Sequence, residues 1–251
     1  MKRALTILLL LASASVSPLI FPIAESGRSA MDVLAKFALL PSAALLLITV
    51  GTLYRFDESL ARTSAVGLAA GAVATVALEA IRLPGFWLGF MPGNLPRLMG
   101  VLLLNQFAAG PSLKSDVAGW AYHFWNGASF GLIYVLVFGT CRRWVGTVFG
   151  VLLGFGFMFS PVVSALGVGF MGLEFSKGFP LTVTFAHTAF GLALGWLTTA
   201  WLGFVDSPSL GAVRQCFPKR VVAQRFSHQA ALRQAVTVLI LANRCKRGSP
   251  N

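Results

Sequence analysis

The sequence predicts an all-α integral membrane protein, a helical bundle of about six transmembrane helices with glycine-ladder packing. Hydrophobic residues make up 56% of the 251 residues and charged residues 11%, which is far from the balance of a soluble domain. Several apolar runs reach the roughly 20 residues needed to cross a hydrocarbon core about 30 Å thick. Glycine or another small residue recurs at every fourth position in four of these runs, a spacing typical of membrane helices in close contact.

Two parts are expected along the chain, a transmembrane bundle over 1–206 and a basic tail over 207–251. The segment 1–23 is either the first span or a signal peptide, because it has a basic start, an apolar run and an export-type cleavage site, Ala12-Ser13-Ala14. The apolar run continues to Ile23, which favours a span that is retained.

Five more spans are expected after the first, and a segment between two of them does not cross. The five apolar runs cover 36–54, 64–81, 117–141, 145–168 and 181–203. The stretch 82–115 is interrupted by prolines and glycines, and its apolar part is too short to cross. We expect this stretch to form an interfacial or re-entrant segment whose irregular backbone is shielded by protein.

Positive charges predict the orientation of the bundle. With six spans and the amino terminus inside, 14 Lys and Arg residues lie on the inner side and 6 on the outer side, and eight of the inner ones belong to the tail. This bias predicts a protein of the bacterial inner (cytoplasmic) membrane with both termini cytoplasmic. A seventh span would reverse the ratio.

The net charge of +12 indicates the lipid bilayer as a partner and not nucleic acid, because the basic residues flank apolar runs. The tail is either an amphipathic helix on anionic lipids or a partly disordered segment, since it combines an apolar patch at 236–241 with prolines. A second copy of the chain or another membrane protein is a further candidate partner.

Glycine faces predict which helices pack most closely. Lipid supplies no hydrophobic drive between helices, so close backbone approach and dispersion stabilise their contact. The first two spans lack such a face and are expected at the periphery. The glycines expected at helix contacts are Gly67, Gly71, Gly127, Gly131, Gly146, Gly150, Gly154, Gly191 and Gly195.

Two of these faces begin with a histidine in the pattern H-x3-G-x3-G, at His123 and at His187. Residues four apart share a helix face, and Glu79 occupies the matching stripe of the third span. In the six-span topology all three lie about 3 to 6 residues below the outer boundary, so they share one depth. Asn126, one turn from His123, is a supporting candidate. Ionisable groups in a membrane are costly unless they pair or face inward, so we expect Glu79, His123 and His187 to face one another.

This layer of one glutamate and two histidines has four chemical interpretations. Two imidazoles and a carboxylate form a ligand set suited to a divalent transition metal. The same groups can relay protons, since histidine titrates near physiological pH, and two histidines on separate helices can ligate a haem. In the simplest interpretation, each histidine makes one interhelical hydrogen bond worth about 0.6 kcal/mol and fixes the register of its helix.

Two arginines near this layer, Arg82 and Arg97, bracket part of the irregular segment. They are candidates for binding an anion or a lipid headgroup through the planar guanidinium fork. Their alternative role is to anchor the membrane interface together with Trp87, and we favour this second interpretation.

No catalytic residue is predicted, and an enzyme is not favoured. The sequence has no H-E-x2-H, no G-x-S-x-G and no P-loop. A G-x-G-x2-G match at 167–172 follows an apolar span and not a strand, so its glycines are expected to permit packing and a bend. The expected protein is a small transporter or an ion- and proton-handling protein that uses the layer. The alternative is a non-catalytic structural or assembly protein that binds partner helices or anionic lipid, and an enzyme acting on a lipid ranks third.

The second half of the bundle contains a recognisable pattern, made by His123-x3-Gly127, Phe130, Tyr134, the stretch 157–161 and His187-x3-Gly191. In these positions the chain resembles an uncharacterised family of bacterial multi-pass inner-membrane proteins of unknown function. The similarity covers 64–203. It implies a helical inner-membrane protein and carries no reaction with it.

Overall fold

The structure, a computed structural model, describes residues 2–140, 142–203 and 207–209. Within these residues the chain is all-helical and has no strand, which confirms the all-α class. They belong to one compact unit, Met1–Leu210, and the predicted tail lies outside the described residues except for 207–209. The helices are α1 (Lys2–Glu25), α2 (Met31–Leu34), η1 (Ala35–Leu39), α3 (Leu40–Phe56), α4 (Glu58–Trp87), α5 (Leu95–Leu103), α6 (Leu113–Phe138), α7 (Arg143–Met158), α8 (Pro161–Ala165), η2 (Phe170–Gly172) and α9 (Gly178–Leu202).

Five helical stretches of the described chain are long and apolar enough to cross a membrane, as a multi-pass membrane protein requires. Helix α6 has 26 residues, about 39 Å at 1.5 Å per residue, but it is less apolar because it carries His123 and Asn126. The five stretches are Lys2–Glu25, Met31–Phe56, Glu58–Trp87, Arg143–Ala165 and Gly178–Leu202.

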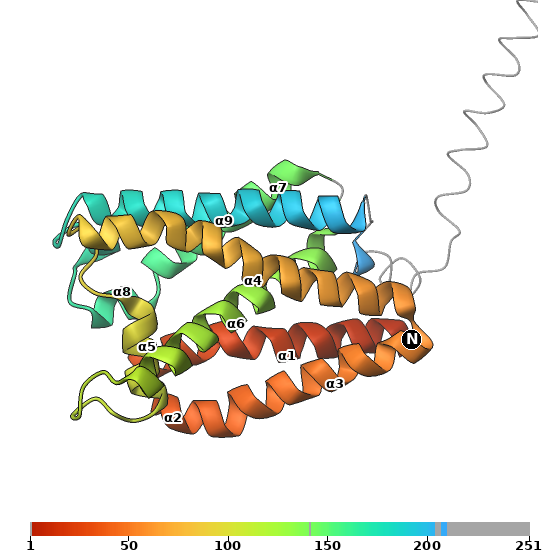
Figure 1. The fold of residues 1–251 in the computed structure, drawn as a ribbon, viewed down its shortest axis with the longest axis horizontal. Helices are drawn as coiled ribbons and strands as arrows, with labels where there is room; N and C mark the ends of the chain where they lie inside the picture. The colour runs from red at the N-terminus through yellow and green to blue at the C-terminus, as the bar shows by residue number, and fades with distance from the viewer. Residues whose placement is uncertain (1, 141, 204–206, 210–251) are drawn as a thin grey trace, which may run out of the picture. The chain divides into compact units, whose positions relative to one another are not determined.

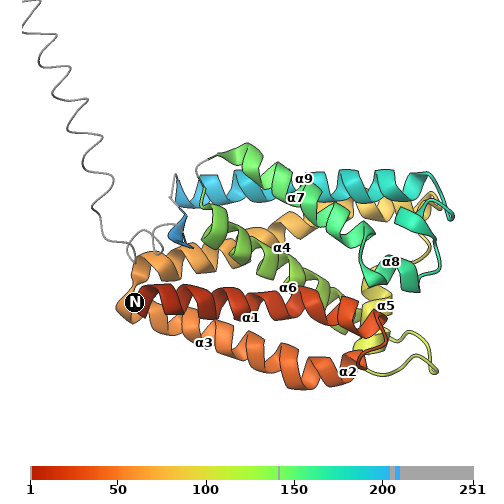
Figure 2. The ribbon, with the colours of Figure 1, turned by 180° about the vertical axis from the view of Figure 1, so that it is seen from behind.

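The long helices run in alternating directions, so their ends form two sets (Figures 1 and 2). The start of α1, the turn between α3 and α4, and the end of α9 lie at one end of the bundle. The α1–α2 turn, α5 and α8 lie at the other end. Helices α6 and α9 therefore begin at the same end of the bundle.

Helix α4 is longer than its apolar run predicts. The Asp57 carboxylate accepts a hydrogen bond from the backbone N–H of Leu60 at 3.1 Å and so caps the start of the helix. At its other end α4 continues through Pro84 to Trp87, since a proline near the end of a helix removes only one backbone bond. The first part of the predicted irregular segment is thus helical, and Arg82 lies inside α4.

The remainder of that segment holds the short helix α5, which packs against the start of α6. Its nine residues are too few to cross a membrane. A Cβ added to Gly100 would lie 2.6 Å from the carbonyl carbon of Ser115, so the two backbones touch where they cross. Ser112 and Ser115 form a capping box at the start of α6, in the same turn as this contact.

Glycines lie at the contact of the antiparallel helices α4 and α6. A Cβ added to Gly71 would lie 2.8 Å from the Cα of Gly131 and 2.9 Å from the carbonyl carbon of Gly127. Both neighbours are backbone atoms and cannot rotate away. Any side chain larger than hydrogen at Gly71 would therefore push the two helices apart.

A second antiparallel pair, α7 and α9, makes the same kind of contact. A Cβ added to Gly150 would lie 2.8 Å from the Cα of Gly191, and a Cβ added to Gly146 would lie 2.7 Å from the Cα of Gly195. Gly154 continues this face, and a Cβ added to it would lie 3.0 Å from the Cβ of His187. Helix α9 also packs against α4, which joins the two pairs (Figures 1 and 2).

Helix α1 is part of the core and not peripheral, contrary to the expectation from its lack of glycines. The hydroxyl of Tyr122 on α6 donates to the carbonyl oxygen of Ser17 at 2.7 Å. The Ser17 hydroxyl in turn donates to Oδ1 of Asn126 at 2.5 Å. Phe21 of α1 is 4% exposed within an apolar cluster that includes Tyr122 and Met99. Hydroxyl and amide groups thus dock this helix.

Candidate functional site

A buried ion pair on α4 is the centre of the candidate site. Glu79 and Arg82 lie three residues apart, so their side chains share one face of the helix. Arg82 donates from Nε to Oε1 of Glu79 at 2.7 Å and from Nη2 to Oε2 at 2.6 Å. Both residues are only 5% exposed. The bidentate pair neutralises two charges that would be costly to bury separately.

The Arg82 guanidinium is not fully satisfied by this pairing. Its Nη2 also donates to Oδ1 of Asn94 at 3.2 Å, so the loop before α5 contributes to the site. Its Nη1 is buried and has no hydrogen-bond partner among the described residues. A buried guanidinium N–H without an acceptor is unfavourable, and such groups in native proteins call for an explanation.

His123 of α6 joins the ion pair directly. Its Nε2 lies 2.7 Å from Oε1 of Glu79. Because an ionised carboxylate only accepts hydrogen bonds, Nε2 carries the proton and donates it. In the neutral ring Nδ1 is then an acceptor, and it has no hydrogen bond within the described part of the chain. The expected contact between Glu79 and His123 is therefore present.

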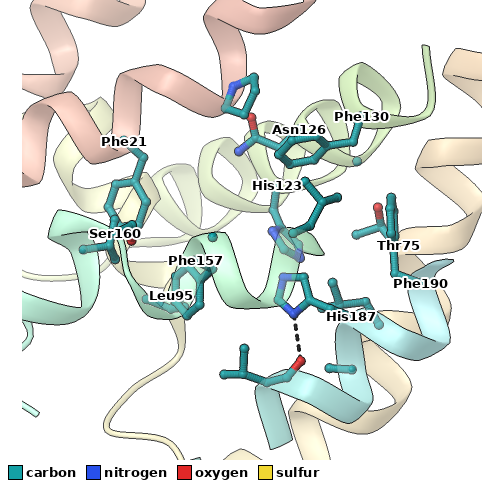
Figure 3. A pocket seen from close by; sticks show the side chains of 18 of the residues that line it. Phe21, Thr75, Leu95, His123, Asn126, Phe130, Phe157, Ser160, His187 and Phe190 are labelled. Carbon is teal, nitrogen blue, oxygen red and sulfur yellow. Dashed lines mark hydrogen bonds between the residues drawn. The ribbon is translucent and has the colours of Figure 1, made fainter. Parts of the chain in front are cut away.

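His187 of α9 reaches the same region from the opposite pair of helices. Its Nδ1 donates to the carbonyl oxygen of Val183 at 2.8 Å, which leaves Nε2 as the acceptor of the neutral ring. The ring stacks on Phe157 with a centroid distance of 6.1 Å and an interplanar angle of 20°. Figure 3 shows His123 and His187 pointing toward one another.

The metal interpretation does not gain support from this geometry. No group of three His, Cys, Asp or Glu side chains in the described ranges is placed to hold a metal ion. Both oxygens of Glu79 already accept from Arg82, and Oε1 also accepts from His123. The Glu79 carboxylate is thus already bonded to the Arg82 guanidinium and the His123 imidazole.

The remaining candidate residues have different roles. Asn126 bonds Ser17 and so contributes to the docking of α1. Arg97 lies at the bundle end, where its Nε donates to Oδ1 of Asp116 at 3.1 Å, and its side chain is 54% exposed. Arg82 and Arg97 are each paired with a carboxylate of their own, so their geometry does not indicate one shared anion site.

A cavity of about 500 Å³ adjoins the two imidazoles and Arg82. Its walls come from α1, α4, α6, α7 and α9, and from the α5 region. The walls are mainly apolar and include four phenylalanines, while His123, His187, Arg82, Asn126 and Ser160 contribute polar groups. The phenylalanines, shown in Figure 3, are Phe21, Phe130, Phe157 and Phe190.

The mouth of this cavity lies on the side of the bundle, between α1 and α7. Leu19 of α1 is 54% exposed and Leu152 of α7 is 61% exposed, yet both line the cavity. Gly156, one turn after Leu152, is also exposed and lines it. The Oγ of Ser160 is buried inside and has no hydrogen-bond partner among described residues. An apolar molecule can enter such a site sideways and meet polar groups within.

No known protein family, no curated protein and no solved structure matches this chain. Its function is therefore inferred from the site alone.

The sequence indicates Glu79, His123 and His187 as site residues, but the role of Arg82 differs from the one expected. Arg82 was expected at the interface, although its i,i+3 spacing from Glu79 on a continuous helix would have indicated the ion pair. No sequence signal indicated that Ser160 or α1 would line a cavity with the histidines.

Proposed function

We propose that this chain is a transporter-like multi-pass membrane protein that binds a lipophilic solute within its helical bundle. The single observation that supports this is the convergence of a laterally open apolar cavity and a buried Glu79–Arg82–His123 network. An intramembrane ionisable group is costly, so its presence in a cavity wall favours a functional site. The size of the cavity falls in the range of small-molecule sites, about 300–1,000 Å³.

In this proposal the protein has six spans, because α6 crosses the membrane in addition to the five stretches named above. The polar residues of α6 lower its hydropathy, but His123 and Asn126 bond within the bundle and do not face lipid. The 12 Lys and Arg residues outside the tail divide evenly between the two ends of a six-span bundle. The eight basic residues of the tail therefore decide the orientation, with both termini cytoplasmic in the bacterial inner membrane and the tail near anionic lipid.

A second candidate function, proton handling, is favoured by the 2.7 Å contact between Nε2 of His123 and Glu79. A proton taken up at Nδ1 of His123 would be stabilised by the adjacent carboxylate and could pass to Nε2 of His187. This activity is compatible with solute binding, since a protonated imidazole pair would change the polar end of the cavity.

The alternative of a structural protein that binds partner helices through its glycine faces is less well supported. The glycines of α4, α6, α7 and α9 already contact helices of the same chain, as Gly71 and Gly150 illustrate. A face that is used within the bundle offers no surface to a partner helix. Partner binding would have to use other surfaces, such as the exposed side of α3.

Photolabelling of the full-length protein in nanodiscs tests solute binding. The probes are three C16 chains with a mid-chain diazirine, ending in a hydroxyl, a methyl ether or a carboxylate. We expect at least one probe to label residues of the cavity wall and to be displaced by an excess of the same compound without diazirine. Absence of displaceable labelling by all three would refute the proposed function.

A matched pair of variants locates the labelling. Gly156 lines the mouth and has open space where a Cβ would be, so Gly156→Trp should obstruct entry without disturbing helix contacts. Gly51 is equally open to a side chain and lies on α3, away from the cavity. We expect Gly156→Trp to reduce labelling about tenfold and Gly51→Trp to leave it unchanged. Equal labelling of the two variants would place the probe outside the cavity.

A further inference from the structure

We infer that the solute is a neutral lipophile with a hydroxyl group, which donates its hydrogen bond to the imidazole pair. This inference rests on the proposed function, because it names the chemical class that the same cavity accepts. It follows from three features of the site: the tautomers of the two histidines, the charge balance of the polar residues, and the buried donors that lack acceptors.

The tautomers are fixed by the partners on the other side of each ring. Glu79 holds the proton of His123 on Nε2, and the Val183 carbonyl holds the proton of His187 on Nδ1. Each neutral ring therefore offers its second nitrogen as an acceptor, and the rings point toward one another (Figure 3). Two acceptors cannot bond each other, so a donor such as a ligand O–H is the group that satisfies them.

The charge balance argues against an anionic head. Arg82 is the one residue with a permanent charge among the described residues that line the cavity, and Glu79 neutralises it through two hydrogen bonds. A phosphate or carboxylate placed here would have no free counter-ion in a medium of low dielectric constant. A cationic head would meet the same difficulty, since both oxygens of Glu79 are already occupied.

A hydroxyl oxygen also accepts hydrogen bonds, and the cavity wall contains buried donors. Nη1 of Arg82 and Oγ of Ser160 both lack partners among the described residues. Arg82 is 5% exposed, so its Nη1 cannot be satisfied by bulk water. An alcohol combines one donor with an acceptor, so it can donate to one imidazole nitrogen while its oxygen remains able to accept from a donor of the wall.

The body of the solute follows from the walls and the mouth. The wall residues Phe21, Phe130, Phe157 and Phe190 offer apolar contact, and Leu19 and Leu152 flank the mouth at the surface that lipid would cover. A long alkyl or isoprenoid chain can occupy this space and extend through the mouth into the bilayer. The solute is therefore a long-chain or isoprenoid alcohol. It can be a component of the membrane or a product formed from one.

The three photoprobes introduced above distinguish this inference from the proposed function. We expect the hydroxyl probe to label the cavity roughly fivefold more strongly than the methyl ether, as one neutral hydrogen bond would give. We also expect it to exceed the carboxylate. Equal labelling by alcohol and ether, or preferential labelling by the carboxylate, would overturn the inference while leaving solute binding intact. Absence of labelling by all probes would instead overturn the proposed function itself.

Three variants assign the preference to the imidazole pair. His187→Phe keeps a ring against Phe157 but removes one of the two acceptors, so the preference for the alcohol over the ether should fall. His187→Gln restores an acceptor and should recover part of the preference. If the full preference survives both in His187→Phe and in His123→Phe, which removes the other acceptor, the hydroxyl is recognised elsewhere and the inference is wrong. Thermal unfolding of each variant confirms that the comparison is made on folded protein.

Discussion

The buried ion pair on α4 predicts an asymmetric pattern of stability losses. Glu79→Gln leaves the guanidinium of Arg82 buried without a counter-charge, beside the neutral Asn94, and breaking a buried pair in this way costs about 3–5 kcal/mol. Arg82→Met should cost less, because His123 remains 2.7 Å from Glu79 and can take up a proton from solvent to become its counter-ion. The double variant should lose much less than the sum of the two, since it removes both charges together.

Reversible unfolding in mixed detergent micelles measures these differences. About 1.4 kcal/mol changes an equilibrium constant tenfold, so Glu79→Gln should lower the folded-to-unfolded ratio by roughly two to three and a half powers of ten. Glu58→Gln is the matched control, because Glu58 is exposed in the first turn of the same helix and should cost under about 1 kcal/mol. Equal losses for Glu79→Gln and Glu58→Gln, or strict additivity in the double variant, would refute the coupling.

Three further predictions concern packing, topology and the first helix. Gly71→Ala should destabilise the bundle by about 1–3 kcal/mol in the same unfolding assay, whereas Gly51→Ala, which meets no atom within 4 Å, should be neutral or slightly stabilising; similar effects would contradict the close contact. Alkaline phosphatase fused after Gly203 should be inactive because the proposed orientation places that end in the cytoplasm, and high activity would reverse the orientation. The mass of the purified protein should include the residues before Ala14, since Leu10 is fully buried; a mature chain starting at residue 15 would show that the segment is a signal peptide.

The contact between Glu79 and His123 could be predicted because it follows from the glycine spacing. Glu79 lies four residues after Thr75, and His123 lies four residues before Gly127. When Thr75 docks beside Gly127 in an antiparallel pair, these two side chains are carried to the same level on the packed face. The general positions of the apolar helices could be predicted for a similar reason, since run length and bilayer thickness determine them.

Other features could not be predicted because they depend on how helices meet in three dimensions. Pro84 indicated an irregular segment, but a proline in the last turn is tolerated, and α4 therefore carries Arg82 to Glu79. The docking of α1 depends on Ser17, Tyr122 and Asn126, whose spacing forms no pattern in one sequence. A cavity reflects the volume that side chains leave unfilled, which no local signal encodes.

The arrangement of close and distant helices explains why the cavity lies where it does. Glycines bring α4 close to α6 and α7 close to α9, and α4 and α9 then join the two pairs. Helices α6 and α7 have no such glycine contact with each other. They meet instead through the rings of Tyr134 and Phe149, whose centroids lie 5.5 Å apart. Bulky rings hold two helices farther apart than glycines do. The space between these helices therefore opens on the side where Gly156 has no side chain, and the two histidines project into it from opposite pairs.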